Sequence, residues 1–419
     1  MKDNGGVWIT GVGLATPLGS DLGEFTANLL AGRCAIRRVT KMAIAGHPSQ
    51  IAAELVDIPR PQAVDEAVWV KHAPLEQLVL WCMIRALQNG DLWERRQSLP
   101  IGVVLGLGAE WPYFWERYWF AWEHERVAPG RPAALQIHKQ DCHLPERPLV
   151  HRVCEQLGLD GPRVTIAAAC ASGNYALGLA RQWIRSGRVA VCLAGACDLP
   201  VTPLSMSCFG NLRALSRRND QPQAACRPFD RQRDGFVMGE GGAVFVLEAE
   251  EHARRRKAEP LAAILGFGAS SDASHLVIPN SDPEPAARAL RLALADARIG
   301  PEDINYLNAH APGTPVGDRC ETRVVQLVFG EAAKRVPVSS TKSMTGHGVT
   351  AASALEAAAC IGALRAQAIP PTINLDDPDP ECDLCHVSRE ARPARLQIVA
   401  SNSFGFGGSN TMLILKRVA

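Results

Sequence analysis

Cys170 has the residue type and the surroundings of a catalytic nucleophile. The segment 163–174 reads as a short strand, the cysteine, a turn of small residues and the start of a helix over 175–185. The free N–H groups and positive end of a helix favour a thiolate, and the small residues that follow let a substrate approach closely. A buried structural thiol is the alternative interpretation, and the local sequence leaves both open.

Three later segments add side chains that can do chemistry, each at the end of an expected strand. His310 begins a Pro/Gly loop, Lys342 and His347 share the segment 339–347, and 401–410 is a glycine-dense turn. One histidine at a strand end is more often structural, and a glycine-rich turn is usually only a turn. Together with Cys170, however, two histidines and a lysine at such junctions favour nucleophilic catalysis.

The composition indicates a well-packed protein without general affinity for polyanions. The chain has 419 residues, 47% hydrophobic and 21% charged, with a formal net charge of +1, which argues against nucleic-acid binding. No uninterrupted apolar run approaches a membrane span, and the first residues lack the apolar stretch of a signal peptide. The 13 cysteines are therefore interpreted as reduced thiols in a cytoplasmic protein.

Strands alternate with helices along the chain, which is typical of an α/β fold with largely parallel strands. A faint internal repeat supports two similar halves, because both Arg163 and Arg335 begin a strand, a turn and an apolar helix; the halves would meet near residues 250–260. The elements are expected as strands near 7–11, 101–107, 163–169, 189–195, 241–248, 262–269 and 304–308, and as helices near 21–31, 73–90, 175–185, 250–257, 284–297 and 351–366.

The chain resembles the β-ketoacyl-acyl carrier protein synthases of the elongating, type II kind, within the thiolase superfamily. This resemblance implies an α/β, thiolase-like fold whose two similar halves are stacked as five layers, α-β-α-β-α. The N-terminal half, 1–257, would carry the nucleophile, and the C-terminal half, 258–419, would carry the two histidines and the lysine. The resemblance is densest in the segments 169–173, 227–231, 233–241, 340–347, 370–375 and 402–408.

The resemblance implies an acyltransferase that performs a decarboxylative Claisen condensation. Cys170 would take an acyl group from an acyl carrier protein, and a malonyl-carrier would then lose CO2 while His310 and His347 donate to its thioester oxygen. Lys342, with Glu356, would set the charge balance of the site. The substrates would arrive on the phosphopantetheine of the carrier protein, and no bound cofactor or metal is expected.

The resemblance also assigns residues around this group. The backbone N–H groups of Cys170 and Phe406 would hold the oxyanion of the condensation, and Phe406 and Phe404 would gate the acyl pocket. The remaining candidates would support the site or bind the pantetheine arm and the acidic carrier protein: Asp318 and Glu321 for support, and Thr314, Arg213, Arg217 and Arg218 for binding.

The chain departs from the family's usual pattern in two places and has one unusual segment. Pro312 stands where the family's first threonine helps to bind pantetheine, and Thr350 and Ser353 stand where the family usually has glycines. The segment 111–122 places four tryptophans on one helical face. It predicts aromatic packing in the core or at the two-fold contact of a homodimer, with a reshaped acyl pocket or partner surface as the alternative.

Other functions fit the sequence less well than that of a condensing enzyme. A chain-length-determining, non-catalytic partner of a heterodimer typically lacks the nucleophile, so Cys170 argues against it. A degradative thiolase needs a second cysteine near the C-terminus, where 405–408 has none. The run 382–386 fits a haem-attachment pattern in an unsuitable context. A further set fits no standard metal spacing: His138, Cys142, His143, His151 and Cys154.

The pathway also stays open at this point. Fatty-acid elongation, type II polyketide synthesis and specialised-lipid synthesis all use this chemistry, and the sequence gives neither the acyl-chain length nor the starter unit.

Overall fold

The computed structural model describes residues 5–108, 116 and 147–418. Its main sheet contains two groups of five strands, and both groups follow the same order of strands. The N-terminal group has the order β5-β4-β6-β8-β1, with bounds Arg163–Ile166, Ile101–Leu107, Val191–Asp198, Gly241–Ala249 and Val7–Ala15. The C-terminal group has the order β11-β10-β15-β16-β9, with bounds Pro337–Ser339, Tyr306–Asn308, Ile398–Gly405, Ser409–Lys416 and Ala262–Ser271.

The strand directions repeat as well. The fourth strand of each group, β8 or β16, is antiparallel to both neighbours, while the other neighbouring pairs are parallel. The groups touch where β1 and β9 pair at only two positions, and the short strand β13 (Cys385–His386) extends the far edge. The expected internal repeat is therefore present in the topology; the boundary between 257 and 258 stays a prediction.

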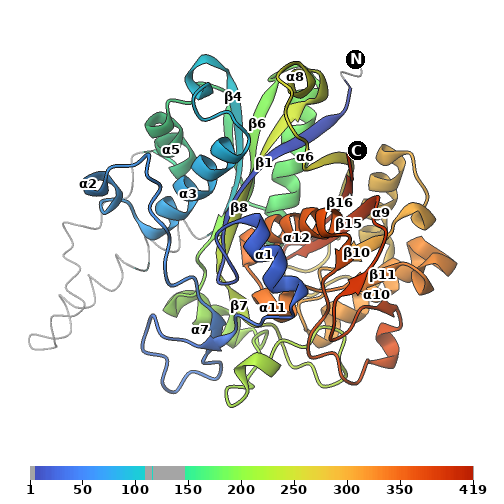
Figure 1. The fold of residues 1–419 in the computed structure, drawn as a ribbon. Helices are drawn as coiled ribbons and strands as arrows, with labels where there is room; N and C mark the ends of the chain where they lie inside the picture. Colours follow the sequence, from blue (N-terminus) through green and yellow to red (C-terminus); the bar gives the residue numbers. More distant parts are fainter. Residues whose placement is uncertain (1–4, 109–115, 117–146, 419) are drawn as a thin grey trace, which may run out of the picture.

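Helices form three layers around the two halves of the sheet (Figure 1). The central helices α6 (Ser172–Arg185) and α12 (Ala352–Ala366) contact each other and strands of both halves. Helix α3 (Pro74–Asn89) covers the outer face of the N-terminal strands, and α9 (Glu284–Ala297) covers that of the C-terminal strands. Three hydrophobic clusters fill these interfaces, and the five-layer prediction is confirmed.

The remaining elements connect these layers or extend their edges. Helix α10 (Pro315–Phe329) packs beside α9, and α8 (Glu250–Arg255) leads from β8 towards β9. The others are α1 (Leu22–Leu30), α2 (Glu66–Trp69), α5 (Leu149–Leu157), α7 (Pro203–Asn211), α11 (Lys342–Thr345), β2 (Arg37–Arg38), β3 (Ile51–Ala53), β7 (Met238–Gly239), β12 (Ala368–Ile369) and β14 (Arg392–Pro393).

One apolar stretch of the described chain, which includes helix α12, is mostly buried in the fold. Residues 349–366 are apolar and long enough to cross a bilayer, but 83% of this window is buried inside the fold. Ala and other small side chains let α12 lie between the two halves of the sheet, with Leu355 and Leu364 in the central cluster. The tryptophan segment 111–122 lies outside the described residues, apart from position 116.

Pairs of glycines let the outer helices approach the sheet in both halves. A Cβ at Gly13 in β1 would lie 2.1 Å from the carbonyl oxygen of Cys82 in α3, and one at Gly11 would lie 2.3 Å from that of Ala86. In β9, a Cβ at Gly268 would lie 2.1 Å from the carbonyl oxygen of Ala289 in α9. Larger residues would push each helix off its sheet, because these obstacles are backbone atoms.

This packing predicts that Gly13→Ala destabilises the protein. The added methyl group must displace α3, at a cost of about 1–3 kcal/mol or more, which urea unfolding followed by circular dichroism measures. Gly23→Ala in the exposed first turn of α1 is the matched control; its nearest obstacle is a flexible carboxylate oxygen of Asp21, at 3.2 Å. Equal unfolding free energies for the two variants would contradict this account of the helix packing.

Candidate active site

The chain presents Cys170 in a strained turn between β5 and α6. Ala169, directly before it, has a φ of 47°, an uncommon value for a residue with a side chain. The side chain of Ser172 holds the turn by accepting the N–H of Ala168 at 2.9 Å and donating to the carbonyl of Ala169 at 2.7 Å. The expected strand 163–169 therefore ends at Ile166, and helix α6 begins at Ser172, three residues earlier than expected.

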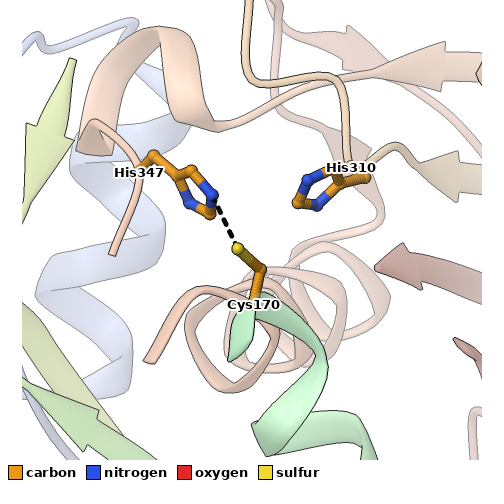
Figure 2. A group of neighbouring side chains, drawn as sticks. All are labelled: Cys170, His310 and His347. Atoms are coloured by element: carbon orange, nitrogen blue, oxygen red, sulfur yellow. Dashed lines mark hydrogen bonds between the residues drawn. The ribbon is translucent and has the colours of Figure 1, made fainter. Parts of the chain in front are cut away.

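Two histidines from the C-terminal half face this thiol (Figure 2). Nε2 of His347 lies 3.1 Å from Sγ of Cys170. His310 follows β10, and its ring centroid lies 5.4 Å from that of His347. All three predicted side chains are buried, with His310 the most exposed at 7%. The structure thus brings together residues that are far apart in the sequence.

Burial controls the ionisation of this group. It holds the pKa values of His310 and His347 well below the usual range, and the positive charge of Lys342 lowers them further. Burial also raises the pKa of the Cys170 thiol to about 12, although Lys342 and the N–H groups of Phe406 and Cys170 act in the opposite direction. The helix end that was expected to favour a thiolate is outweighed, so the resting site holds a thiol and two neutral imidazoles.

Lys342 and Glu356 form a buried ion pair behind the histidines. The Lys342 ammonium also donates to the carbonyl oxygen of His310 at 2.5 Å. Burial raises the pKa of Glu356 to about 7, and the Lys342 charge opposes this rise. Lys342 therefore fixes the His310 backbone, and its charge adds to the effect of burial in keeping both rings neutral.

Two buried carboxylates of α10 hold the loop that begins with His310. Glu321 accepts the N–H of His310 at 2.9 Å and the N–H of Ala311 at 2.6 Å. Asp318 accepts the N–H groups of Gly313 and Thr314 at 3.1 and 3.2 Å. Both predicted supporting residues therefore act on the backbone rather than on the histidine rings.

The glycine-dense turn closes the site between β15 and β16. Gly407 and Gly408 have φ values of 81° and 76°, which favour glycine. A Cβ at Gly405 would lie 2.9 Å from the carbonyl oxygen of Ala168, so this glycine lets the turn approach the nucleophile. The same approach directs the N–H of Phe406 at the Cys170 sulfur.

One cavity of about 410 Å³ connects these groups. It is lined by most of the predicted site residues: Cys170, His310, His347, Glu321, Phe404, Phe406, Thr314 and Arg213. Arg217 and Arg218 do not line it, and Arg218 is engaged with Asp234 and the carbonyl of Gln232. Of the three predicted basic residues, only Arg213 stands at the cavity.

Sequence reasoning missed several parts of the site. Phe236 packs edge-on against His347 at a centroid distance of 5.1 Å, and the Ser403 hydroxyl donates to the carbonyl of Cys170 at 2.8 Å. The loop around Leu276 and Ile278 lines the cavity and is bonded to the glycine turn, because Gly407 N–H donates to the Leu276 carbonyl at 2.7 Å. Phe236 lies in segment 233–241, where the resemblance to the family is dense, so the sequence could have indicated it. The loop around Leu276 and Ile278 has no such motif in the sequence.

The cysteine and the histidines also form the kind of donor set that suits zinc. Sγ of Cys170 and the ring nitrogens lie within 4.8 Å of one another. However, the Lys342 charge that depresses both imidazole pKa values also opposes a second cation. The expected absence of a metal stays a prediction.

The structure describes the residues of the haem-attachment pattern but only part of the alternative metal set. Cys382 is buried, and its carbonyl oxygen lies 2.7 Å from Nε2 of His386, so this run forms packing contacts. His138, Cys142 and His143 lie outside the described residues.

Comparisons with known proteins agree with this architecture. Residues 5–253 match the family described as Beta-ketoacyl synthase, N-terminal domain, and 261–376 match its C-terminal domain. The chain is 37% identical over 416 residues to 3-oxoacyl-[acyl-carrier-protein] synthase 2 of Coxiella burnetii, covering 98% of each protein. It is 38% identical over 418 residues to the tetracenomycin polyketide synthase ketoacyl synthase alpha subunit of Streptomyces glaucescens, covering 98% of this chain and 97% of that one.

Solved structures give the same result. A beta-ketoacyl synthase from Burkholderia phymatum is 33% identical, with a TM-score of 0.85 over 99% of this chain and 100% of that one. The ishigamide ketosynthase/chain length factor is 32% identical, with a TM-score of 0.83 over 99% of each chain. A complex of a type II polyketide acyl-carrier protein with its ketosynthase gives a TM-score of 0.87 at 29% identity, also over 99% of each.

The fold and the thiol–imidazole site define an acyltransferase of the thiolase superfamily. The chain belongs to the β-ketoacyl synthase family. The resemblance to an elongating ketosynthase of fatty-acid or polyketide synthesis is confirmed.

The raised pKa of Cys170 predicts how the free enzyme reacts with iodoacetamide. Because the thiolate is the nucleophile and the pKa is about 12, the alkylation rate should rise without levelling between about pH 7 and about pH 10. Quenched time points analysed by mass spectrometry give this rate, and Cys170→Ala corrects for exposed thiols such as Cys208. A plateau near the usual thiol pKa would contradict the dominance of burial.

Proposed function

We propose that this chain catalyses decarboxylative condensation of a malonyl-carrier protein with an acyl group held on Cys170. The observation that supports this best is the convergence of the Cys170 thiol with the neutral imidazoles of His310 and His347 in one cavity. A thiol can hold the acyl group as a thioester, and neutral imidazoles can donate hydrogen bonds without adding charge to the site.

In the first step, Cys170 takes the acyl group from phosphopantetheine. Sγ forms a bond to the acyl carbonyl carbon, the bond from that carbon to the pantetheine sulfur breaks, and the thiol proton ends on the released pantetheine thiol. The N–H groups of Phe406 and Cys170 point at the Cys170 sulfur. Together with Nε2 of His347 at 3.1 Å, they stabilise the sulfur's negative charge during the transfer.

In the second step, malonyl-carrier loses CO2 and its C–C bonding electrons form an enolate. His310 and His347 donate Nε2–H bonds to the enolate oxygen, and the low pKa of each ring keeps it neutral for this purpose. The carbanion attacks the thioester on Cys170, and the resulting oxyanion is held by the N–H groups of Cys170 and Phe406. Collapse releases the β-ketoacyl-carrier and the Cys170 thiolate, which takes up a proton.

The surrounding residues keep this geometry fixed. Lys342 and Glu356 set the potential and hold the carbonyl of His310. Asp318 and Glu321 hold the His310 loop through its N–H groups. The half-buried Phe404 lies at a centroid distance of 6.0 Å from His310, and Phe406 packs against Phe209 of α7 at 6.1 Å, so both are placed to gate the acyl pocket.

The carrier protein reaches the site through the mouth of the cavity. Thr314 and Arg213 line this passage, where they would contact the pantetheine arm and the acidic carrier. Pro312 also lines it and offers no hydroxyl, so Thr314 supplies the remaining contact of this type. Arg217 is exposed and contributes to the electrostatic attraction of the carrier protein. Arg218 contributes less, because it is engaged with Asp234.

The oligomeric state and the cellular location are part of the same proposal. We infer a cytoplasmic homodimer, with residues 1–257 and 258–419 as its two halves and the tryptophan segment at or near the two-fold contact. A heterodimer with a related subunit is the second candidate, because the ishigamide ketosynthase/chain length factor has this fold at a TM-score of 0.83. The presence of Cys170 favours a catalytic subunit in either assembly.

The acylation test separates the two catalytic steps. Wild type incubated with acyl-carrier thioesters should gain the acyl mass on the intact protein, and Cys170→Ala should not. His310→Ala should still be acylated, yet lose about 10²–10³-fold in the rate of condensation with malonyl-carrier, because one oxyanion donor is gone. Absence of acylation at every chain length would overturn the catalytic proposal and favour a non-catalytic partner subunit.

Charge reversal tests the carrier surface. Arg213→Glu should raise KM for carrier-bound substrates and weaken the salt dependence of kcat/KM, with kcat nearly unchanged. Arg255→Glu on α8, at the top of the view in Figure 1 and far from α7, is the control, since Arg255 is exposed and pairs only loosely with Glu251 at 3.8 Å. Equal effects of the two variants would show that Arg213 has no special contact with the carrier.

A further inference from the structure

A second strained turn lies beside the one that carries Cys170. Val349, two residues after His347, has a φ of 46°, which is a genuine outlier for a β-branched residue. Such a conformation persists only where its surroundings impose it. The 3-10 turn 349–351 leads into α12 as the turn 169–171 leads into α6, and the two turns contact each other.

Asp198 is hydrogen-bonded to the second turn. This residue ends β6 and is 1% exposed. Its Oδ2 accepts the N–H of Thr350 at 3.0 Å. Burial raises the pKa of Asp198 to about 6, and the Thr350 hydroxyl and N–H oppose this rise. The backbone of Thr350 is therefore held by a carboxylate from the opposite half of the protein.

A glycine provides the space for this contact. Gly108 directly follows β4, next to β6, and a Cβ there would lie 2.0 Å from Oγ1 of Thr350 and 3.3 Å from Oδ2 of Asp198. The Thr350 hydroxyl therefore fills the space that a side chain at 108 would need.

The contact matters for catalysis because of where His347 lies. The backbone of His347 itself is held by the segment 237–239: its N–H donates to the Val237 carbonyl at 2.7 Å, and Gly239 N–H donates to its carbonyl at 2.9 Å. After His347, Val349 packs against a hydrophobic cluster of the N-terminal half, and the N–H of Thr350 donates to Asp198. The segment that carries the imidazole is therefore held at His347 and again at Thr350, where the anchor is this carboxylate.

We propose that Asp198 is a positioning residue that acts through Thr350 to hold the turn after His347, so that Nε2 of His347 stays aimed at the sulfur of Cys170. This inference rests on the proposed catalytic role of His347 and adds a residue to it. Asp198 touches neither substrate nor reacting atoms in this account. Loss of the carboxylate lets Val349 relax from its strained conformation and moves the ring relative to the thiol.

The test compares Asp198→Asn with Glu248→Gln. Glu248 is buried in β8 and pairs with Val191 at the opposite end of the β6–β8 ladder from Asp198, so both variants remove a buried carboxylate. Asp198→Asn should lower kcat for condensation about 10- to 100-fold, with KM changed less than about twofold, because small misplacements of a catalytic group are this costly. Glu248→Gln should reduce thermal stability without this selective loss of kcat.

Two further measurements protect the test against misfolding. Thr350→Ser keeps both donors and should retain near wild-type kcat, whereas Thr350→Val keeps the volume, loses the hydroxyl and should lower kcat. The alkylation rate of Cys170 by iodoacetamide should fall in both Asp198→Asn and His347→Ala, and this readout needs no condensation.

The outcomes separate this inference from the proposed function. If wild type condenses, His347→Ala does not, and a folded Asp198→Asn keeps its kcat, only the positioning role is overturned. If KM rises while kcat is unchanged, or if Glu248→Gln loses kcat equally, the positioning role is also overturned. If wild type itself neither acylates nor condenses, the proposed function fails first.

Discussion

The buried ammonium of Lys342 is the charge on which the site depends. Removing a charge from water is costly unless it is paired and hydrogen-bonded, and Lys342 meets this need with Glu356 and the His310 carbonyl. These two contacts hold the ammonium in place, and its position determines the electrostatic potential at the two histidine rings. Burial lowers the pKa of His310 and of His347, and the Lys342 charge lowers both further, so both rings stay neutral donors when negative charge develops on a substrate oxygen.

Burial has opposite consequences for the two kinds of catalytic group. For the imidazoles it prevents protonation, which suits donors to an enolate oxygen. For Cys170 it raises the thiol pKa to about 12, so the nucleophile is not stored as a thiolate. The charge on sulfur is favourable only as the acyl group is transferred, when Nε2–H and the two backbone N–H groups can stabilise it. The site therefore stabilises reacting charges rather than resting ones.

The sequence was sufficient for groups that lie inside short motifs. Cys170, His310, His347 and the Lys342–Glu356 pair were all predicted, and the structure places them together. The contacts that sequence reasoning missed are those between distant segments: Asp198 ends a strand of otherwise apolar and small residues, and its partner Thr350 is 152 positions away. The engagement of Arg218 with Asp234 is likewise visible only in the folded chain, and its role in carrier binding stays a prediction.

The internal repeat explains why strain occurs on both sides of the site. In each half, a 3-10 turn precedes the central helix, and its first residue, Ala169 or Val349, has φ near 46–47°. Cys170 follows Ala169 as Thr350 follows Val349, so the threonine occupies in the second half the place of the nucleophile in the first.

The same kind of turn therefore has a different role in each half. In the first half it exposes a sulfur to the cavity and is held locally by Ser172. In the second half the N–H of the equivalent residue, Thr350, donates to Asp198 of the other half, which ties the histidine segment to β6. The two halves must keep their catalytic groups in register, and this buried carboxylate adds a contact across their interface to those that the segment 237–239 makes with His347.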